Sequence, residues 1–313
     1  MIFIDNNNVT DPRINLALEE FAVRNFSDGE YLLLYVNMPT VVLGKHQNAL
    51  EEIDLPYAAK NDIAVIRRIS GGGAVYHDAG NLNFSVITDH RQGLHNNYQP
   101  FLAPVIATLA GWGVESRLNN RNSLVLADGR KVSGNAQFTS RGRMMSHGTL
   151  LFRSDLNMLN KVLLSKEKPV ESRAVASVRS RVANLSEVLP PETSFEEFRG
   201  RVLEGFIGDT VQVRTLTDEE WRLVHELADE KYDRWEWNIG RSPQFVVQRD
   251  VNVRGESISV RLRVVDGMIA EVLLAEETGS TASDCSALVG RRYDPVQIDA
   301  MLTIDAADLE ARQ

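Results

Sequence analysis

Three short segments of this chain carry residues whose types and spacing suit chemistry on anions. The first begins with Arg67 and Arg68, continues through Ser70 to the glycines Gly71–Gly73, and ends in AVYHD. Glycines let the backbone take positive φ or approach a ligand closely, and successive N–H groups can form an anion-binding concavity. This segment therefore predicts an anion site. It is neither a P-loop nor a dinucleotide-binding fingerprint, because the GK[ST] and GxGxxG patterns are absent.

The other two segments add a cation, a hydroxyl and an imidazole. Residues 129–137 read GRKVSGNAQ, and residues 146–150 read SHGTL. On a strand Lys131 and Ser133 share one face, which sets an ammonium beside a hydroxyl where it can meet a phosphate or carboxylate. His147, the imidazole, is followed directly by Gly148.

Each segment taken alone also has an ordinary structural interpretation. The glycines suit a tight turn with two surface arginines, and Lys131 suits a solvent-facing charge on an edge strand. For these two segments the structural interpretation is favoured when each is taken alone. For His147 a hydrogen-bonded structural role and a functional role are evenly matched.

Composition narrows the function classes. The chain has 313 residues, of which 43% are hydrophobic and 25% charged, which is typical of a soluble globular protein with one large domain and one smaller domain. A net charge of −9 argues against nucleic acid as a partner. No run approaches the roughly 18 apolar residues of a membrane span, so no membrane partner is expected.

The cysteine and histidine content indicates the redox compartment and limits the kinds of metal site that the chain could form. The single Cys285 excludes an internal disulfide and every multi-cysteine metal site, which fits a reducing cytoplasm. The six histidines show no ligand spacing, so no structural transition metal is predicted.

Hydrophobic patterning predicts the elements that must position the three segments. Helices are predicted from the N-cap at Thr10-Asp11-Pro12 and at 99–111, 155–163, 194–207 and 217–231. Strands are predicted at 31–36, 40–43, 63–67, 74–77, 82–88, 148–153 and 211–216, with a hairpin of 123–127 and 131–138 closed by Asp128-Gly129.

The pattern changes after Ser242-Pro243. Three strand-like runs follow, at 245–253, 257–265 and 268–275, with a terminal helix from Pro295. We therefore expect a catalytic domain over 1–243 and a small accessory domain over 244–313. The predicted fold class is α+β, with a mixed, mostly antiparallel sheet flanked by helices in the large domain and a small α+β C-terminal domain.

Together the segments resemble the lipoate-protein ligase family, in its long bacterial form with a C-terminal accessory domain. The resemblance spans most of the chain in the family's order and implies a biotin/lipoate ligase-like fold. Its motifs are RRISGGGAVYHDAGNLN at 67–83, RN at 121–122, KVSGNAQ at 131–137, HGTLL at 147–151, SVRSRVANL at 177–185 and YDRWEWNIGRSPQF at 232–245.

The resemblance implies a two-step reaction. Lipoate is adenylated with Mg²⁺ and ATP to lipoyl-AMP and pyrophosphate, and the acyl group then passes to a lysine of an acceptor. The implied acceptors are lipoyl domains of 2-oxoacid dehydrogenase E2 subunits or the glycine-cleavage H protein. The implied enzyme is a cytoplasmic monomer without an acyl-enzyme nucleophile, because the mixed anhydride is already activated.

The resemblance also implies residue roles. Lys131 is the catalytic residue, bridging the attacking carboxylate and the α-phosphate, where positive charge is needed as negative charge develops. Lipoate would be bound by Arg68, Gly72, Lys131 and His147. ATP and lipoyl-AMP would be bound by Arg68, Gly71, Gly72, Gly73, Ala74, Val75, Tyr76, Asp78, Asn81, Asn122, Lys131, Ser133 and Ala136.

One position departs from the family pattern. The family usually has Asp after Arg-Asn, whereas here Ser123 follows Arg121-Asn122, so a carboxylate expected near Mg²⁺ is missing. Mg²⁺ held by triphosphate and water needs only one or two protein ligands. The metal therefore arrives with ATP near Asn122, and no protein ligand is assigned.

Two other functions remain open from the sequence. An octanoyl- or lipoyl-transferase of the same fold would use a cysteine thioester, and its one candidate here is Cys285 in the small domain. A catalytically silent module that binds lipoyl-AMP or a lipoyl domain is the second. A biotin ligase would need a GRGRxxR-type loop, which is not found.

Overall fold

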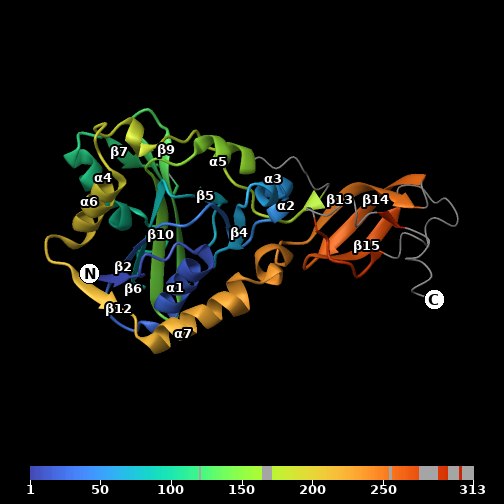
Figure 1. The fold of residues 1–313 in the computed structure, drawn as a ribbon, viewed down its shortest axis with the longest axis horizontal. Helices are drawn as coiled ribbons and strands as arrows, with labels where there is room; N and C mark the ends of the chain where they lie inside the picture. The colour runs from blue at the N-terminus through green and yellow to red at the C-terminus, as the bar shows by residue number, and fades with distance from the viewer. Residues whose placement is uncertain (120, 164–170, 254–255, 275–287, 295–302, 305–313) are drawn as a thin grey trace.

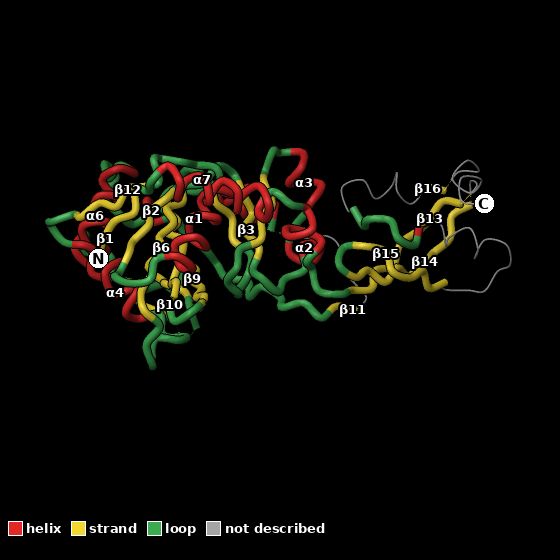
Figure 2. The backbone as a smooth tube through the Cα atoms, turned by 90° about the horizontal axis from the view of Figure 1, so that it is seen from below, coloured by secondary structure: helices red, strands yellow, loops and turns green. Residues whose placement is uncertain are grey.

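A computed structural model describes the chain except for residues 120, 164–170, 254–255, 275–287, 295–302 and 305–313 (Figure 1). Most of the described residues belong to a large unit built on one broad sheet. A smaller sheet lies at one end of the molecule, beside the short helices α2 and α3 (Figures 1 and 2).

The broad sheet has eight strands, and only β1 pairs in parallel with its neighbours β12 and β2. The remaining pairs are antiparallel, so the predicted mixed, mostly antiparallel sheet is confirmed. The strands in spatial order are β12 (Gln212–Thr215), β1 (Ile2–Asp5), β2 (Tyr31–Tyr35), β6 (Asn81–Asp89), β10 (Arg143–Leu151), β9 (Lys131–Ser140), β8 (Ser123–Leu126) and β7 (Ser116–Leu118).

Helices cover both faces of this sheet, as Figure 1 shows. Helices α1 (Pro12–Asn25) and α7 (Asp218–Leu227) pack on one face, and α4 (Gln99–Gly111) and α6 (Phe195–Ile207) pack on the other. Strand β2 explains the arrangement, because all five of its residues are buried. Side chains alternate across a strand, so Leu32 and Leu34 enter the core under α4 while Leu33 enters the core under α1.

A second, three-stranded sheet carries the glycine loop. Its order is β4 (Ala64–Arg67), β3 (Thr40–Leu43) and β5 (Val75–His77), with β3 parallel to β4 and antiparallel to β5. Residues 68–74 connect β4 to β5 and therefore turn back over the end of β3. The helices α2 (Ala49–Glu52), α3 (Leu55–Lys60) and α5 (Leu156–Val162) lie nearby.

The C-terminal sheet is built from β13 (Phe245–Val253), β14 (Glu256–Val265) and β15 (Met268–Leu274), with β11 (Glu171–Ser172) and β16 (Thr303–Ile304) both paired to β13. Earlier residues contribute to this unit, because β11 joins its sheet and Leu50 packs in its core. The boundary at residue 243 remains a prediction. Cys285 and most of the terminal helix predicted from Pro295 lie outside the described residues, and the described part, Thr303–Ile304, is strand β16 rather than helix.

The sequence misplaced one helix boundary and one strand boundary, and it missed several short elements. The strand predicted over 148–153 is β10, which begins at Arg143. The helix predicted over 217–231 ends at Leu227, and wider turns continue to Tyr232. The amide of Asp233 donates to the carbonyl of Ala228, five residues back, at 2.8 Å. The missed elements are β1, β7, β11, β16, α2 and α3.

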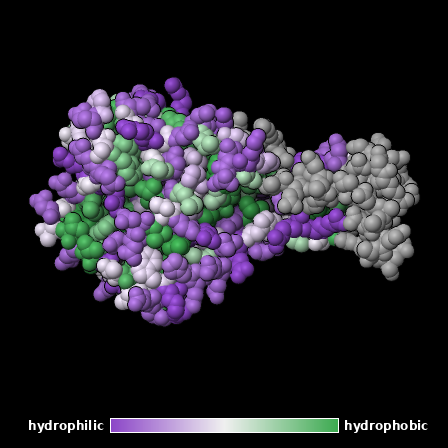
Figure 3. Space-filling model, viewed as in Figure 1, coloured by the Kyte–Doolittle hydropathy of each residue, from purple (hydrophilic) through white to green (hydrophobic). Residues whose placement is uncertain are grey.

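The face drawn in Figure 3 is mainly hydrophilic over the large unit, with hydrophobic residues in separate small groups. Among the described residues, no helix is both long enough and apolar enough to cross a membrane.

Candidate active site

Two adjoining cavities open between the broad sheet, the glycine loop and the segment 175–182. The first, here called the inner chamber, has a volume of about 280 Å³, and the second, the outer chamber, about 640 Å³. Both are lined by Ala74, Val75, Lys131, Gly134 and Thr149. Lys131 therefore stands where the two chambers meet.

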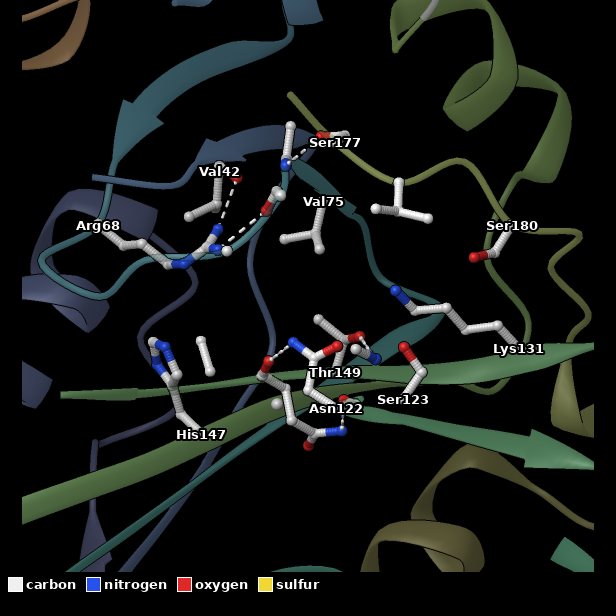
Figure 4. A pocket seen from close by; sticks show the side chains of 18 of the residues that line it. Val42, Arg68, Val75, Asn122, Ser123, Lys131, His147, Thr149, Ser177 and Ser180 are labelled. Atoms are coloured by element: carbon white, nitrogen blue, oxygen red, sulfur yellow. Dashed lines mark hydrogen bonds between the residues drawn. The ribbon is translucent and has the colours of Figure 1, made fainter. Parts of the chain in front are cut away.

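The Arg68 side chain fixes the conformation of the glycine loop. It is 6% exposed, and its Nη2 donates to the carbonyls of Gly71 and Gly73 at 2.6 and 2.9 Å, while its Nη1 donates to the Val42 carbonyl at 3.0 Å (Figure 4). The loop turns at Gly72, whose φ of +90° is strained for any residue with a Cβ. The arginine and the glycine together set the wall of the inner chamber.

Arg67 ties the base of the same loop to the segment that precedes the small sheet. This arginine is fully buried, and its guanidinium donates to the carbonyls of Gly44 (3.0 Å), Gln47 (2.7 Å) and Trp237 (3.1 Å). Burial lowers its pKa to about 10. Asn238 accepts from the Arg67 amide at 3.0 Å. The motif at 232–245 thus braces the glycine loop rather than lining either chamber.

Lys131 is fixed by its backbone on both sides. Its amide donates to the Arg181 carbonyl at 2.8 Å, and its carbonyl accepts from the Ala183 amide at 3.0 Å. Gly134 leaves room for its side chain, because a Cβ there would lie 2.8 Å from the lysine Nζ. The ammonium points into the open space of the site, across from Arg68 and His147 (Figure 4).

The Lys131 ammonium has no acidic partner among the described residues. Burial lowers the lysine pKa, and the nearby charge of Arg68 lowers it further. None of the described residues that line the inner chamber is Asp or Glu. A partly buried cation without a countercharge is costly, so this position suits a ligand that brings its own negative charge.

Neutral polar groups stand beside the lysine on β8 and β9. Asn122 and Ser123 line the inner chamber. The Asn122 carbonyl accepts from the Asn135 amide at 3.0 Å, which pins the turn before β8 to β9. Ser123 is 5% exposed, and its amide donates to the side chain of Asn119 at 3.0 Å.

A buried hydrogen-bonded chain closes the far end of the inner chamber. Glu19 from α1 lies 3.0 Å from His147 Nδ1, and His147 Nε2 lies 2.7 Å from Ser70 Oγ. The same Oγ accepts from Arg68 Nε at 2.9 Å. Tyr35 is hydrogen-bonded to Glu19. His147 thus links helix α1 to the glycine loop.

Segment 175–182 is held against the glycine loop by Ser177. Its Oγ accepts from the Ala74 amide at 3.0 Å and from Gln47 Nε2 at 2.9 Å, and its amide donates to Glu52 at 2.8 Å. Gly73 permits the approach, since a Cβ there would lie 2.8 Å from that Oγ. This contact therefore holds segment 175–182 in place as a wall of both chambers.

The structure brings most of the candidate site residues together. Those that line a chamber are Arg68, Gly72, Gly73, Ala74, Val75, Tyr76, Asn122, Lys131, Ser133, Ala136 and His147. Gly71, Asp78 and Asn81 line neither chamber. Asp78 instead accepts from the amides of Gly80 (2.9 Å) and Asp155 (2.8 Å), which orders the turn before β6 and the start of α5.

Sequence reasoning missed the residues at the inner end of the site. They are Leu16, Tyr35, Val42, His77 and Asn83. His77 and Asn83 fall inside the motif at 67–83, which is the signal that could have found them. The others are apolar or aromatic residues of ordinary helix and strand patterns, and their sequence context carries no such signal.

Comparison with known proteins decides the family. Residues 11–207 match the model of the lipoyl protein ligase A/B catalytic domain. The chain belongs to this family. The lipoate-protein ligase LplJ of Bacillus subtilis is 43% identical over 303 residues, covering 94% of this chain and 91% of that protein.

Two solved structures share the fold. A lipoate-protein ligase A bound with ATP is 32% identical with a TM-score of 0.64, covering 77% of this chain and 98% of that one. A structure from Thermoplasma acidophilum, described as a bipartite lipoate protein ligase and its E2 lipoyl domain, is 32% identical with a TM-score of 0.67, covering 77% and 96%. The predicted fold and the prediction of an ATP-dependent lipoate-protein ligase are confirmed, and the transferase alternative is not favoured.

Proposed function

We propose that this lipoate-protein ligase works through Lys131, with the acyl chain in the inner chamber and the nucleotide in the outer chamber. The observation that carries the proposal is the placement of a partly buried ammonium, with no acidic partner among the described residues, where the two chambers meet. Adenylation joins two anions, a carboxylate and a triphosphate, at one point. A preorganised cation at that point stabilises the negative charge that develops in the transition state.

The chemistry has two balanced steps. A carboxylate oxygen of lipoate attacks the α-phosphorus of ATP, forming the anhydride bond as the bond to pyrophosphate breaks. The acceptor lysine amine then attacks the acyl carbon, and AMP leaves while the amine loses a proton. In both steps Lys131 holds an α-phosphate oxygen, so one residue serves adenylation and transfer.

The lining of each chamber supports this division. Leu16, Val42 and the aromatic ring of Tyr35 give the far end of the inner chamber apolar walls suited to a hydrocarbon chain. The outer chamber includes Val75 and Tyr76 of β5, an edge strand whose free side would offer main-chain groups to the nucleotide base. Asn122, at the rim, would face the phosphates.

Magnesium fits this site as a companion of ATP. Near Lys131 the inner chamber offers the neutral oxygens of Asn122 and Ser123, and the outer chamber is lined by the carboxylates Glu51 and Glu52. Such a donor set suits an ion that keeps most of its ligands as phosphate oxygens and water. When bound, the ion neutralises phosphate charge.

Ser123→Asp is expected to lower the Mg²⁺ concentration that gives half-maximal adenylation and to leave turnover at saturating Mg²⁺ little changed. The added carboxylate supplies the ligand that the family usually has, and saturating metal hides a weaker site. Pyrophosphate release measured against Mg²⁺ at fixed ATP checks this. Slower turnover at saturating Mg²⁺ would mean that the carboxylate repels the triphosphate instead.

The acceptors that we propose are E2 lipoyl domains and the glycine-cleavage H protein, served by a cytoplasmic monomer. The Thermoplasma structure pairs a ligase with an E2 lipoyl domain, which supports the first acceptor. The H protein, the monomeric state and the compartment rest on the family resemblance.

Mass spectrometry of an apo lipoyl domain tests the function directly. The domain is incubated with the protein, Mg²⁺, ATP and lipoate, and in parallel with octanoyl carrier protein as a rival donor. We expect a lipoyl adduct on one lysine that requires ATP and pyrophosphate release. ATP-independent acyl transfer from the carrier protein would favour a transferase, and no adduct from either donor would favour a binding module.

A further inference from the structure

His77 lies at the inner end of the inner chamber with one ring nitrogen unused. It is the last residue of β5, is 3% exposed, and lines the cavity together with Val42 and His147. Its Nδ1 lies 3.0 Å from Asn37 Nδ2. Its Nε2 is buried and has no hydrogen-bond partner among the described residues. A buried polar atom of this kind calls for a ligand.

A chain of buried amides fixes which nitrogen of His77 carries the proton. Asn6 Nδ2 donates to Asn15 Oδ1 at 3.0 Å, and Asn15 Nδ2 donates to Asn37 Oδ1 at 2.9 Å. Asn37 must therefore turn its NH₂ group toward His77, whose Nδ1 accepts. In a neutral imidazole the proton then sits on Nε2, which becomes a donor.

The ring is neutral at ordinary pH. Burial, together with the charges of Arg68 and His147, lowers the pKa of His77 to about 3. His77 therefore offers a single N–H donor and no positive charge.

The other polar groups at this end already have partners. His147 uses both ring nitrogens, on Glu19 and Ser70. Tyr35 is hydrogen-bonded to Glu19. Asn83 Nδ2 donates to the Tyr35 carbonyl at 3.2 Å. Of these groups, His77 Nε2 is the donor left over, and His77 lines only the inner chamber, whereas Lys131 stands where the two chambers meet.

We propose that the Nε2–H of His77 recognises the sulfur-bearing end of the acyl chain and thereby selects lipoate over octanoate. The proposal rests on the proposed function, which places the carboxylate at Lys131 and the tail at this end. A dithiolane sulfur is a weak hydrogen-bond acceptor. Octanoate has the same number of carbons but ends in a methyl group, so it would leave the buried N–H unpaired.

This effect is one of specificity. A site that offers a hydrogen bond rejects an analogue that cannot make it, because the buried group is then left unsatisfied. Because sulfur is a weak acceptor, we expect this hydrogen bond to contribute a modest preference for lipoate, about fivefold from His77 alone.

A competition experiment with two variants tests the proposal. The wild type, His77→Phe and the matched control His225→Phe are each given equal lipoate and octanoate with Mg²⁺, ATP and apo lipoyl domain, and the two adducts are quantified. His225→Phe makes the same substitution at an exposed histidine of α7 that lines neither chamber. We expect the lipoate preference to fall about fivefold in His77→Phe, mainly through a higher KM for lipoate, and to stay unchanged in His225→Phe.

Histidine ¹⁵N NMR of the wild type gives a readout that needs no turnover and no variant. We expect a neutral His77 protonated on Nε2, with a shift of that nitrogen on adding lipoate that octanoate does not produce. Nδ1 protonation, equal shifts with both acids, or an unchanged preference in folded His77→Phe would each overturn the proposal. If the wild type adenylates neither acid while lipoate still shifts Nε2, the proposed function fails and the recognition stands.

Discussion

Replacing Lys131 with Met is expected to reduce lipoyl-AMP formation by about 10²–10³ fold, the usual consequence of losing one preorganised charge at a reacting centre. Methionine nearly matches the length of the lysine side chain and removes only its charge and donors. The ammonium has no acidic partner among the described residues, so its electrostatic effect is available to the ligand. Pyrophosphate release with lipoate and Mg²⁺-ATP measures the change.

Although Lys131→Met should lose activity, its stability should be unchanged or higher. Burial lowers the pKa of this lysine, which means that the fold disfavours its charged form. Removing an uncompensated buried charge does not destabilise a protein through lost pairing. We therefore expect an unfolding temperature equal to or above that of the wild type.

The matched control for this change is Lys60→Met. Lys60 is exposed at the end of α3 and lines neither chamber, so the variant loses the same charge from the chain as a whole. Its pyrophosphate release should equal that of the wild type. Near-normal release by Lys131→Met, or an equal loss in Lys60→Met, would remove the lysine from the mechanism.

The sequence predicted much of this fold because its longer elements follow simple periodicities. Strand β2 is a continuous apolar run, which predicts a buried strand. Helix α1 begins at an Asp-Pro cap, which predicts a helix start. The short helix α2 has only four residues, Ala49–Glu52, and too few turns to show a period. The helix at 218–227 widens after Leu227, where Tyr232 packs in the core and bonds Glu20 at 2.7 Å. Local propensity cannot register such a tertiary contact.

The candidate site was predictable where its residues form compact motifs. Strand register explains how they meet. His147 lies opposite Ala136 in the pairing of β10 with β9, and Ser123 lies opposite Gly134 in the pairing of β8 with β9. The lysine, the histidine and the polar residues of β8 thus belong to one stretch of sheet.

The rest of the site depends on contacts between distant parts of the chain. Ser177 contacts Gln47 across 130 positions, and Glu19 contacts His147 across 128. Arg68 was assigned to ligand binding by resemblance, and in the structure its donors hold the carbonyls of Gly71 and Gly73 in the loop and of Val42 on β3. Its ligand-binding role remains a prediction, since hydrogen bonding inside the loop is not visible in a motif.

Gly44→Ala is expected to damage the active site strongly, although Gly44 lines neither chamber. A Cβ at Gly44 would lie 1.9 Å from the carbonyl oxygen of Gly72 and 2.9 Å from its carbonyl carbon. The obstacle is main chain, which cannot rotate away as a side chain can. The neighbouring backbone is also fixed, since the Lys45 amide donates to the Ser70 carbonyl at 2.9 Å. The glycine loop must therefore move as a unit.

A displaced loop shifts the wall that faces Lys131, and a misplacement of this order costs about 10² in rate. Overpacking should also lower the free energy of unfolding by about 1–3 kcal/mol. Pyrophosphate release and urea unfolding measure the two effects. Gly200→Ala is the matched control, because a Cβ there meets nothing within 4 Å and an alanine inside α6 favours the helix. Unchanged KM values and turnover in Gly44→Ala would show that the loop tolerates the shift, and that its position does not set the geometry around Lys131.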